Sequence, residues 1–151
     1  MNYWLLVTTL NNWNIITQKN VAGISEKQKN AFSKVHEGDK CLIYIRGGRK
    51  PEKISEPAVD GVFEVVSSNY DNVPIFDAPP THPAETYPLR FQLKRVRPLT
   101  EPIPFKPLTS KLSFILNPQR WGSYLQGRGL IPLSEKDYQI IVASLQKERQ
   151  D

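Results

Sequence analysis

The 151-residue sequence has few of the side chains from which metal and catalytic sites are commonly built. It contains one cysteine, Cys41, and two histidines, His36 and His82, without ligand spacing between them. A single cysteine excludes an internal disulfide and a multi-cysteine metal site. Motifs of the forms H-E-x-x-H and G-x-S-x-G, and a Walker-type glycine loop, are also missing from the sequence. The sequence therefore disfavours an enzyme, and we expect no catalytic residue, no metal and no cofactor.

Long apolar runs are missing as well. No window approaches the roughly 18 consecutive apolar residues of a membrane span, so we expect no membrane partner. No basic region precedes an apolar stretch near residue 1, so we expect no signal peptide. Cys41 begins an apolar run, which is typical of a small buried hydrophobe. Together these features predict a cytoplasmic protein.

Proline and charge are absent from particular stretches. All 13 prolines lie beyond residue 50, and residues 1–18 carry no charged side chain. Residues 54–89 contain six acids and no base, between two basic blocks with net charges of +5 (residues 19–53) and +7 (residues 90–128). Two such blocks can fold into one positive face that attracts phosphates. The alternative, in which the cations only solvate the surface, stays open because the net charge of +5 is modest.

What is present indicates a folded domain. Hydrophobic residues make up 39% of the chain and aromatic residues 10%, which suits a single domain over residues 1–151. Apolar runs rich in β-forming residues predict strands over 3–8, 41–46, 61–67 and 89–97. Short strands with a few helices and long loops predict an α+β domain with a curved or barrel-like sheet.

Three segments have sequence features of a helix. Residues 25–35 begin with the capping residue Ser25, and Gln28 three positions later completes a capping box. The segment after Ser134 is the clearest helix, and its apolar stripe at i, i+3, i+4 and i+7 consists of Tyr138, Ile141, Val142 and Leu145. Residues 108–115 also show helical spacing.

Other segments lack a clear period. Residues 9–14 are predicted to form a polar loop, and residues 69–86 contain four prolines in a stretch long enough to be functional or mobile. The alternation of the fourth strand breaks at Arg95–Val96, which predicts a β-bulge. We interpret Gly127–Gly129 as a turn and Glu64 as an outward-facing strand position.

Several aromatic residues lie in polar surroundings. Trp13 and Trp121 lie among Asn, Arg and Gly residues, where an indole either anchors a loop or offers a stacking surface. Both interpretations stay open. Aromatic residues interleaved with basic ones are what the binding of unpaired or flipped bases requires.

A set of short pieces occurs in a particular order along the chain: "NYWLLVT", "GIS" with "EKQKN", "EGDKCLIYI", "GVFEVVS", "YPLRFQLKRV", "KLSFI", "RWGSYL" and "GRGLIPLSEKDY". In these pieces and their order the chain resembles the EVE family, a branch of the PUA-like superfamily related to the YTH domains. Together the pieces cover almost the whole chain, and within the family it looks most like the small, stand-alone archaeal-type members. The resemblance implies a PUA-like small mixed β-barrel flanked by helices. It also implies a pocket for a modified base, such as methylated adenine or cytosine, flipped from DNA or RNA.

The resemblance places the pocket rim on four segments. These are the residues after the first strand, the Gly-Ile-Ser turn, the following helix and the end of the second strand. One departure is Ala22, because relatives usually carry tryptophan just before this glycine. The implied rim residues are Thr8, Thr9, Asn11, Trp13, Ala22, Gly23, Ile24, Ser25, Lys29, Asn30, Ile45 and Arg46, with Tyr87 and Phe76 on the far side.

The favoured interpretation is thus a non-enzymatic, nucleic-acid-binding module, a monomer or weak dimer, that recognises a modified base such as a methylated one. Candidates for contacts with the nucleic-acid backbone are Lys27, Lys29, Arg46, Arg90, Arg95 and Arg120. A second interpretation is an RNA-binding protein that uses only its basic face, without specificity for modification. A third, less favoured, is a hydrolase or nucleotide-modifying enzyme on the same scaffold.

Overall fold

The computed structural model describes residues 1–47, 49–50, 53–54, 56–99 and 101–150. Its helices are α1 (Leu10–Lys19), α2 (Lys29–Phe32) and α3 (Glu135–Gln150), and 3₁₀ segments cover Glu26–Gln28, Lys106–Leu108 and Pro118–Tyr124. The strands are β1 (Tyr3–Thr8), β2 (Val21–Ile24), β3 (Lys40–Ile45), β4 (Arg49–Lys50), β5 (Lys53–Ile54), β6 (Ala58–Tyr70), β7 (Leu89–Arg95), β8 (Ile103–Pro104) and β9 (Leu130–Leu133).

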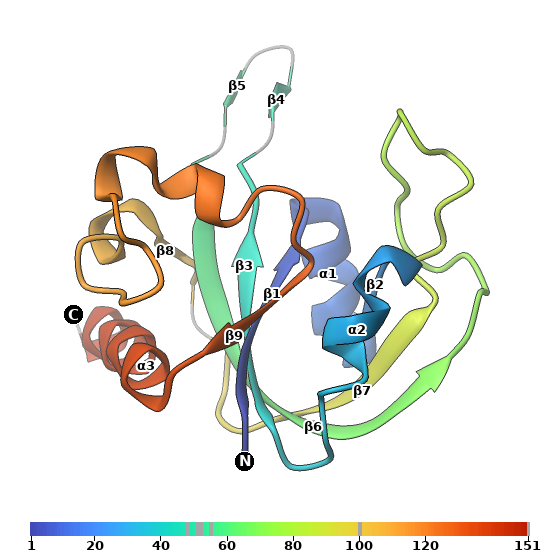
Figure 1. Ribbon diagram of the computed structural model, residues 1–151, viewed down its shortest axis with the longest axis horizontal. Coiled ribbons are helices and arrows are strands. Elements are labelled where there is room, and N and C mark those ends of the chain that lie inside the picture. The colour runs from blue at the N-terminus through green and yellow to red at the C-terminus, as the bar shows by residue number, and fades with distance from the viewer. Residues whose placement is uncertain (48, 51–52, 55, 100, 151) are drawn as a thin grey trace.

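Seven of these strands form one strongly curved sheet (Figure 1). The order is β2-β7-β6-β3-β1-β9, with β8 paired to β6, and β4 and β5 form a separate two-stranded sheet. β1 and β3 are parallel, whereas the other pairs of the large sheet are antiparallel. No pairing joins β2 to β9 in the described part of the chain. The α+β class is therefore confirmed, but the predicted barrel is not.

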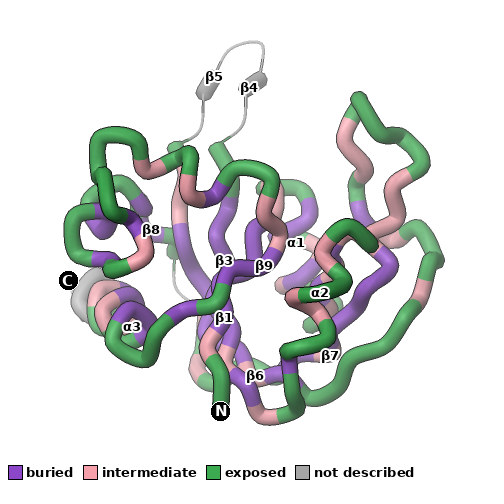
Figure 2. Tube along the Cα trace, viewed as in Figure 1, coloured by how far each residue is buried: buried purple, intermediate pink, exposed green. Residues whose placement is uncertain are grey.

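The sheet separates two hydrophobic cores, which we name after the helices that cover them. In β1, Leu6 faces the α1-side core while Leu5 faces the α3-side core. β3 alternates in the same way, with Ile43 on the first side and Leu42 on the second. Because both faces are covered, these strands are apolar throughout instead of alternating with polar residues. They form the buried centre of the molecule (Figure 2).

A β-bulge lets β6 contribute to both cores. The register with β3 shifts where Leu42 pairs with Val62 but Ile43 pairs with Asp60. The extra residue, Gly61, has φ +75°, a left-handed conformation that glycine adopts readily. A second shift in β6 lies between Val65 and Ser67. The bulge predicted at Arg95–Val96 is wrong, because β7 ends at Arg95 and the irregularities are in its partner.

Helix α3 docks on the α3-side core as its apolar stripe predicts. Tyr138, Ile141 and Leu145 are at most 6% exposed, and each buried side chain of this size contributes about 1.5–3 kcal/mol. At the start of the helix, Ser134 Oγ accepts a hydrogen bond from Asp137 N at 3.1 Å, which confirms the predicted cap. The buried Asp137 carboxylate in turn accepts hydrogen bonds from Ser113 N and Oγ. These bonds attach the chain around Ser113 to the start of α3.

Three predicted elements differ in the structure. The predicted polar loop at residues 9–14 belongs to α1, because Thr9 caps the helix by accepting a hydrogen bond from Asn12 N. The helix predicted over residues 25–35 is a 3₁₀ turn followed by the four residues of α2. Residues 108–115 supply buried apolar side chains, but only a short 3₁₀ segment ends there, at Leu108.

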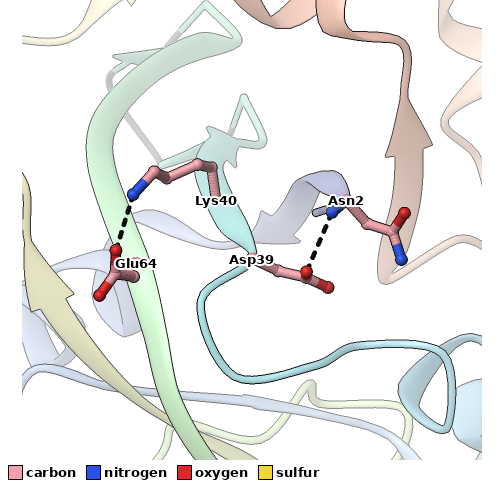
Figure 3. A network of polar contacts seen from close by, with 4 residues as sticks. All are labelled: Asn2, Asp39, Lys40 and Glu64. Carbon is pink, nitrogen blue, oxygen red and sulfur yellow. Dashed lines mark hydrogen bonds and ion pairs between the residues drawn. The ribbon is translucent and has the colours of Figure 1, made fainter.

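A buried carboxylate holds the beginning of β1 to the turn before β3. Asp39 is 2% exposed and accepts hydrogen bonds from the backbone N–H groups of Asn2 and His36 and from the indole of Trp4, at 2.9–3.0 Å. Figure 3 shows the bond from Asn2. Burial alone would raise its pKa, but these donors lower the pKa below its usual value. The ionised carboxylate is therefore part of the folded structure.

Candidate functional site

The pocket that most of the predicted rim residues line, called the main pocket, lies where the end of β1, the end of β2 and two loops meet. Its volume is about 340 Å³, within the roughly 300–1,000 Å³ of small-molecule sites. The residues that line this main pocket are Val7, Thr8, Thr9, Asn12, Ile16, Gly23, Ile24, Ser25, Lys27, Gln28, Arg46, Phe76, Pro79, His82, Glu85, Tyr87, Gly127, Arg128 and Gly129.

Hydroxyl groups line the pocket because two helical segments begin there. Thr9 caps α1, and Ser25 Oγ accepts a hydrogen bond from Lys27 N at 3.3 Å. Both side chains are therefore oriented by the local backbone, and each hydroxyl still has its own O–H to donate. Ser25 follows the last residue of β2, so the segment predicted as a Gly-Ile-Ser turn is an edge strand paired with β7.

An aromatic wall stands on one side of the pocket. The rings of Phe76 and Tyr87 meet edge to face, with centroids 6.3 Å apart, and Tyr87 has the unusual φ of +50°. The Arg90 guanidinium lies 5.1 Å from the centroid of Phe76. Arg90 is 2% exposed and donates to the carbonyl oxygens of Tyr87, Thr86 and Val73 at 2.5–2.9 Å. Arg90 thus holds the wall in place from behind.

Close contact between β2 and this wall requires glycine at position 23. A Cβ there would lie 2.5 Å from the Tyr87 carbonyl oxygen and 2.7 Å from a carbon of the Phe76 ring. Separations this short do not occur for real Cβ atoms, so any side chain would displace the wall. The backbone of β2 can therefore approach the pocket's aromatic groups directly.

The proline-rich loop that carries Phe76 is attached to α1. The Asn12 side chain accepts from Asp77 N at 2.7 Å and donates to Asp77 O at 3.0 Å, and Asn11 donates to the Asp77 carboxylate. Asn12 is 4% exposed, so these bonds are shielded from water. They fix one end of the long loop over the pocket.

The Gly127–Gly129 segment closes the opposite side. Its geometry is set by Gln28, whose Nε2 donates to Gly127 O at 3.2 Å, and by Val7 N, which donates to Gly129 O at 2.9 Å. The sequence analysis missed this segment as a site, interpreting it only as a turn. Its two glycines beside an arginine were a usable signal, although no periodic pattern linked them to residues about 100 positions earlier.

Three cations line the pocket, with one carboxylate. Lys27, Arg46 and Arg128 face Glu85, so the rim is positive on balance. Burial raises the pKa of the Tyr87 hydroxyl, and the charge of Glu85 adds to that effect. Tyr87 therefore remains a neutral hydrogen-bond donor at physiological pH. Exposed His82 lies at the same edge.

The structure brings many of the predicted rim residues together. The main pocket is lined by Thr8, Thr9, Gly23, Ile24, Ser25, Arg46, Phe76 and Tyr87, and by Lys27 from the predicted backbone contacts. Asn30 lines a neighbouring groove instead. Asn11 and Lys29 are exposed and line neither cavity.

Three predicted rim residues are in the core. Trp13 is 5% exposed, with its ring 6.3 Å from that of Phe63, so its indole is not a stacking surface. Ala22 is fully buried in the α1-side core, where it pairs with Phe91, and it does not line the main pocket. Ile45 is 4% exposed in the same core. These three side chains do not line the main pocket.

Three predicted backbone contacts are not among the residues that line the main pocket. Arg90 is buried behind the aromatic wall and donates to carbonyl groups. Arg95 donates to the carbonyl of Thr17, and Arg120 is exposed in a 3₁₀ segment. Neither lines the main pocket.

The described residues contain neither a metal-binding group nor a membrane-spanning helix. No group of His, Cys, Asp and Glu side chains is placed to hold a metal ion among the residues that the structure describes. None of the helices in the described ranges combines the length and apolar character needed to cross a membrane.

This chain is therefore an α+β domain with a mixed, curved sheet. Its pocket lies between the edge strand β2 and the end of β1. The chain is a member of the EVE domain family, whose profile matches residues 2–144. A UPF0310 protein of Pyrococcus abyssi is 36% identical over 146 residues, covering 96% of this chain and 100% of the relative. The predicted family is therefore confirmed.

Solved structures show the same fold at low sequence identity. Human THYN1 protein in complex with DNA containing 5-methylcytosine superposes with a TM-score of 0.56 at 13% identity, covering 95% of this chain and 97% of that chain. The YTH domain of Zygosaccharomyces rouxii MRB1 protein in complex with N6-methyladenosine RNA gives 0.55 at 11% identity, covering 95% and 86%. Identities this low establish the fold alone.

Proposed function

We propose that this protein is a non-enzymatic, nucleic-acid-binding module that takes one modified base, flipped out of a DNA or RNA strand, into the main pocket. The observation that carries the proposal is the combination of groups around one cavity. An aromatic wall, hydroxyl and backbone hydrogen-bonding groups, and a cationic rim surround a space of about 340 Å³. A flipped base needs a stacking surface and hydrogen-bonding partners, and its phosphates need cations.

Each side of the pocket has a role in this proposal. The flipped base stacks against Tyr87, which Phe76 supports from the side. Ser25 and Thr9 hydrogen-bond to the edge of the base, and Gly23 lets the backbone approach it. The apolar side chains of Ile16 and Ile24 offer a surface for a methyl group. Lys27 and Arg46 contact the phosphates.

The comparisons support this assignment by analogy. Two domains of the same fold are bound to a nucleic acid that carries a methylated base, DNA in one case and RNA in the other. The analogy extends to the kind of ligand, and we therefore propose a methylated base without assigning the nucleic acid.

The structure changes which aromatic residue we propose for stacking. Trp13 and Ala22 are buried and do not line the main pocket, so we propose neither position for stacking. Tyr87 lines the cavity and is only half-buried. The missing tryptophan at position 22 is therefore no obstacle to base binding in this chain.

Fluorescence anisotropy with labelled single strands tests the proposal. The probes are an RNA nonamer with central N6-methyladenosine, a DNA nonamer with central 5-methylcytosine, and the two unmethylated counterparts. We expect at least one methylated probe to bind more tightly than its counterpart. Tyr87→Leu should reduce that preference roughly tenfold, because stacking contributes about 1–3 kcal/mol.

Tyr70→Leu is the matched control, since Tyr70 is an exposed tyrosine that bonds to Glu26 and lies outside the pocket. It should leave the preference unchanged. Equal binding of methylated and unmethylated probes by the wild-type protein, or an unchanged preference in Tyr87→Leu, would refute the proposal of base reading in this pocket.

A second candidate function is favoured by the charge of the rim. The cations at Lys27, Arg46 and Arg128 would attract any nucleic acid, whether or not its bases are modified. In that case affinity should fall steeply with rising salt, while the ratio between methylated and unmethylated probes stays at one. The same titrations therefore separate the two candidates.

A further inference from the structure

A second cavity adjoins the main pocket, between α2 and the edge strand β9. Its volume is about 530 Å³, and it shares Lys27, Gln28 and Arg128 with the main pocket. We call it the α2–β9 groove. Figure 1 shows α2 beside β9. Gln28, through its hydrogen bond to Gly127 O, forms the partition between the two cavities.

The groove has the charge that a phosphate requires. The cations Lys27, Lys34 and Arg128 line it, and no Asp or Glu is among its lining residues. By contrast, Glu85 lines the main pocket. Asn2 and Asn30 add amide groups to the groove, and amides donate hydrogen bonds to phosphate and sugar oxygens.

The floor of the groove is apolar and fixed. Trp4 is 4% exposed, with its indole N–H donated to Asp39 at 3.0 Å, and Leu130 is buried in the same α1-side core. Pro132 lies at the exposed edge of β9, where proline lacks an N–H with which to pair another strand. A cationic groove over an apolar floor can accept a sugar, whose carbons need cover, together with its phosphate.

We propose that the α2–β9 groove binds the sugar–phosphate of the nucleotide next to the flipped base, on one side of it only. The proposal rests on the proposed function of the main pocket. Continuity through Lys27 and Arg128 is what makes the groove the path by which the strand leaves the pocket. The backbone path thus runs along Lys27, Arg128 and Lys34 instead of toward Arg90, which is buried.

Lys34→Glu tests the groove without touching the main pocket, because Lys34 lines only the groove. Lys111→Glu is the matched control, an exposed lysine that lines neither cavity. The probes are the methylated and unmethylated nonamers above and the corresponding methylated nucleoside. We expect Lys34→Glu to weaken every nonamer about equally, by roughly fivefold or more at low salt, and to reduce the slope of log K against log salt by about 0.7 per lost contact. Nucleoside binding should not change.

A scan with neutral methylphosphonate linkages then locates the contact. One such linkage is placed in turn on the 5′ and 3′ sides of the central nucleotide. We expect one position, and not its counterpart on the other side, to abolish the difference between the wild-type protein and Lys34→Glu.

The outcomes separate this inference from the function on which it rests. Equal weakening of methylated and unmethylated nonamers, with a side-specific linkage effect, supports the groove even if the main pocket shows no preference for methylation. Unchanged nonamer affinity in Lys34→Glu, an equal loss in Lys111→Glu, or a scan without any position that abolishes the difference would overturn it.

Discussion

The two faces of the sheet are covered in different ways. On the α3-side core, the 16-residue α3 and residues 103–125 pack many apolar side chains against β1 and β3. On the α1-side core, the cover consists of the 10-residue α1, the 4-residue α2 and a long proline-containing loop. The main pocket lies at the edge of the second cover.

This difference indicates a division of labour between the faces. A long amphipathic helix gains stability from repeated apolar contacts along its length and has few unpaired backbone groups near the sheet. Short segments have many ends, and each end offers hydroxyls and backbone groups, such as those of Thr9 and Ser25. The short segments therefore place polar groups at the main pocket, whereas α3 contributes a long buried apolar stripe.

The largest effect is expected from Ile141→Ala, which tests the stabilising face. Ile141 is fully buried in the α3-side core, so losing its side chain should lower the free energy of unfolding by about 2–4 kcal/mol. Denaturant titration measures the change. Gln139→Ala on the exposed side of the helix is the control and should change little. An unchanged midpoint for Ile141→Ala would mean that α3 does not stabilise the domain.

The next effect concerns Asp39, which belongs to the support of β1. Asp39→Asn should destabilise the protein at neutral pH by about 1–3 kcal/mol, because three donors lose their ionised acceptor. Since folding lowers the pKa of Asp39, its contribution is present above the usual pKa of about 3.9 and is lost as the pH falls through the lowered value. The two proteins should therefore converge in stability in acid. A constant difference down to pH 2 or so would contradict the role of the charge.

On the pocket-bearing face, Gly23→Ala should act on binding. The added Cβ would collide with the Tyr87 carbonyl and the Phe76 ring, so the wall must move and affinity should fall roughly tenfold, or about 1.4 kcal/mol. Gly122→Ala is the control, because no heavy atom lies within 4 Å of its added Cβ. Anisotropy measures the affinity and calorimetry the melting temperature. Full affinity in a folded Gly23→Ala protein would place the ligand elsewhere.

The smallest effect is expected at the surface, for Glu64→Gln. Glu64 forms an ion pair with Lys40 at 2.7 Å (Figure 3), and this hydrogen bond and charge lower its pKa. Exposed pairs of this kind contribute little and are screened by salt. The loss of stability should be smaller than for Asp39→Asn and should vanish in about 1 M salt. Glu37→Gln, another exposed carboxylate, is the control; a loss that persists at high salt would contradict this account.

Sequence patterns predicted the stabilising face better than the pocket. The stripe of α3 and the apolar runs of β1 and β3 are determined by local periodicity, and the structure confirms them. The helix around Trp13 was missed because Asn residues surround its few apolar side chains, and packing of Trp13 against Phe63 outweighs this weak local preference. Tertiary contacts decided that element.

The pocket itself could be predicted only in part. The segment around Gly23 and Ser25 was identified from family resemblance, and the structure confirms that both residues line the cavity. Ala22 lies in the α1-side core, which was not predicted because the resemblance gives an order of residues but not which of them the fold buries. Gly127–Gly129 and Lys34 were missed because their proximity to the pocket depends on long-range pairing, which no local pattern encodes.

The position of β9 has a consequence for the order in which the protein can be completed during synthesis. β1 is made first, yet one of its two partners is β9, whose residues follow about 125 positions later in the chain. Val7 N and Gln28 Nε2 likewise form their hydrogen bonds only after the carbonyl groups of Gly129 and Gly127 have been made. A nascent chain that has emerged only as far as β7 therefore already contains Ser25 and Tyr87 but has an open side where the pocket should close. Long-range pairing of this kind slows folding, so the main pocket is complete only after β9 has left the ribosome.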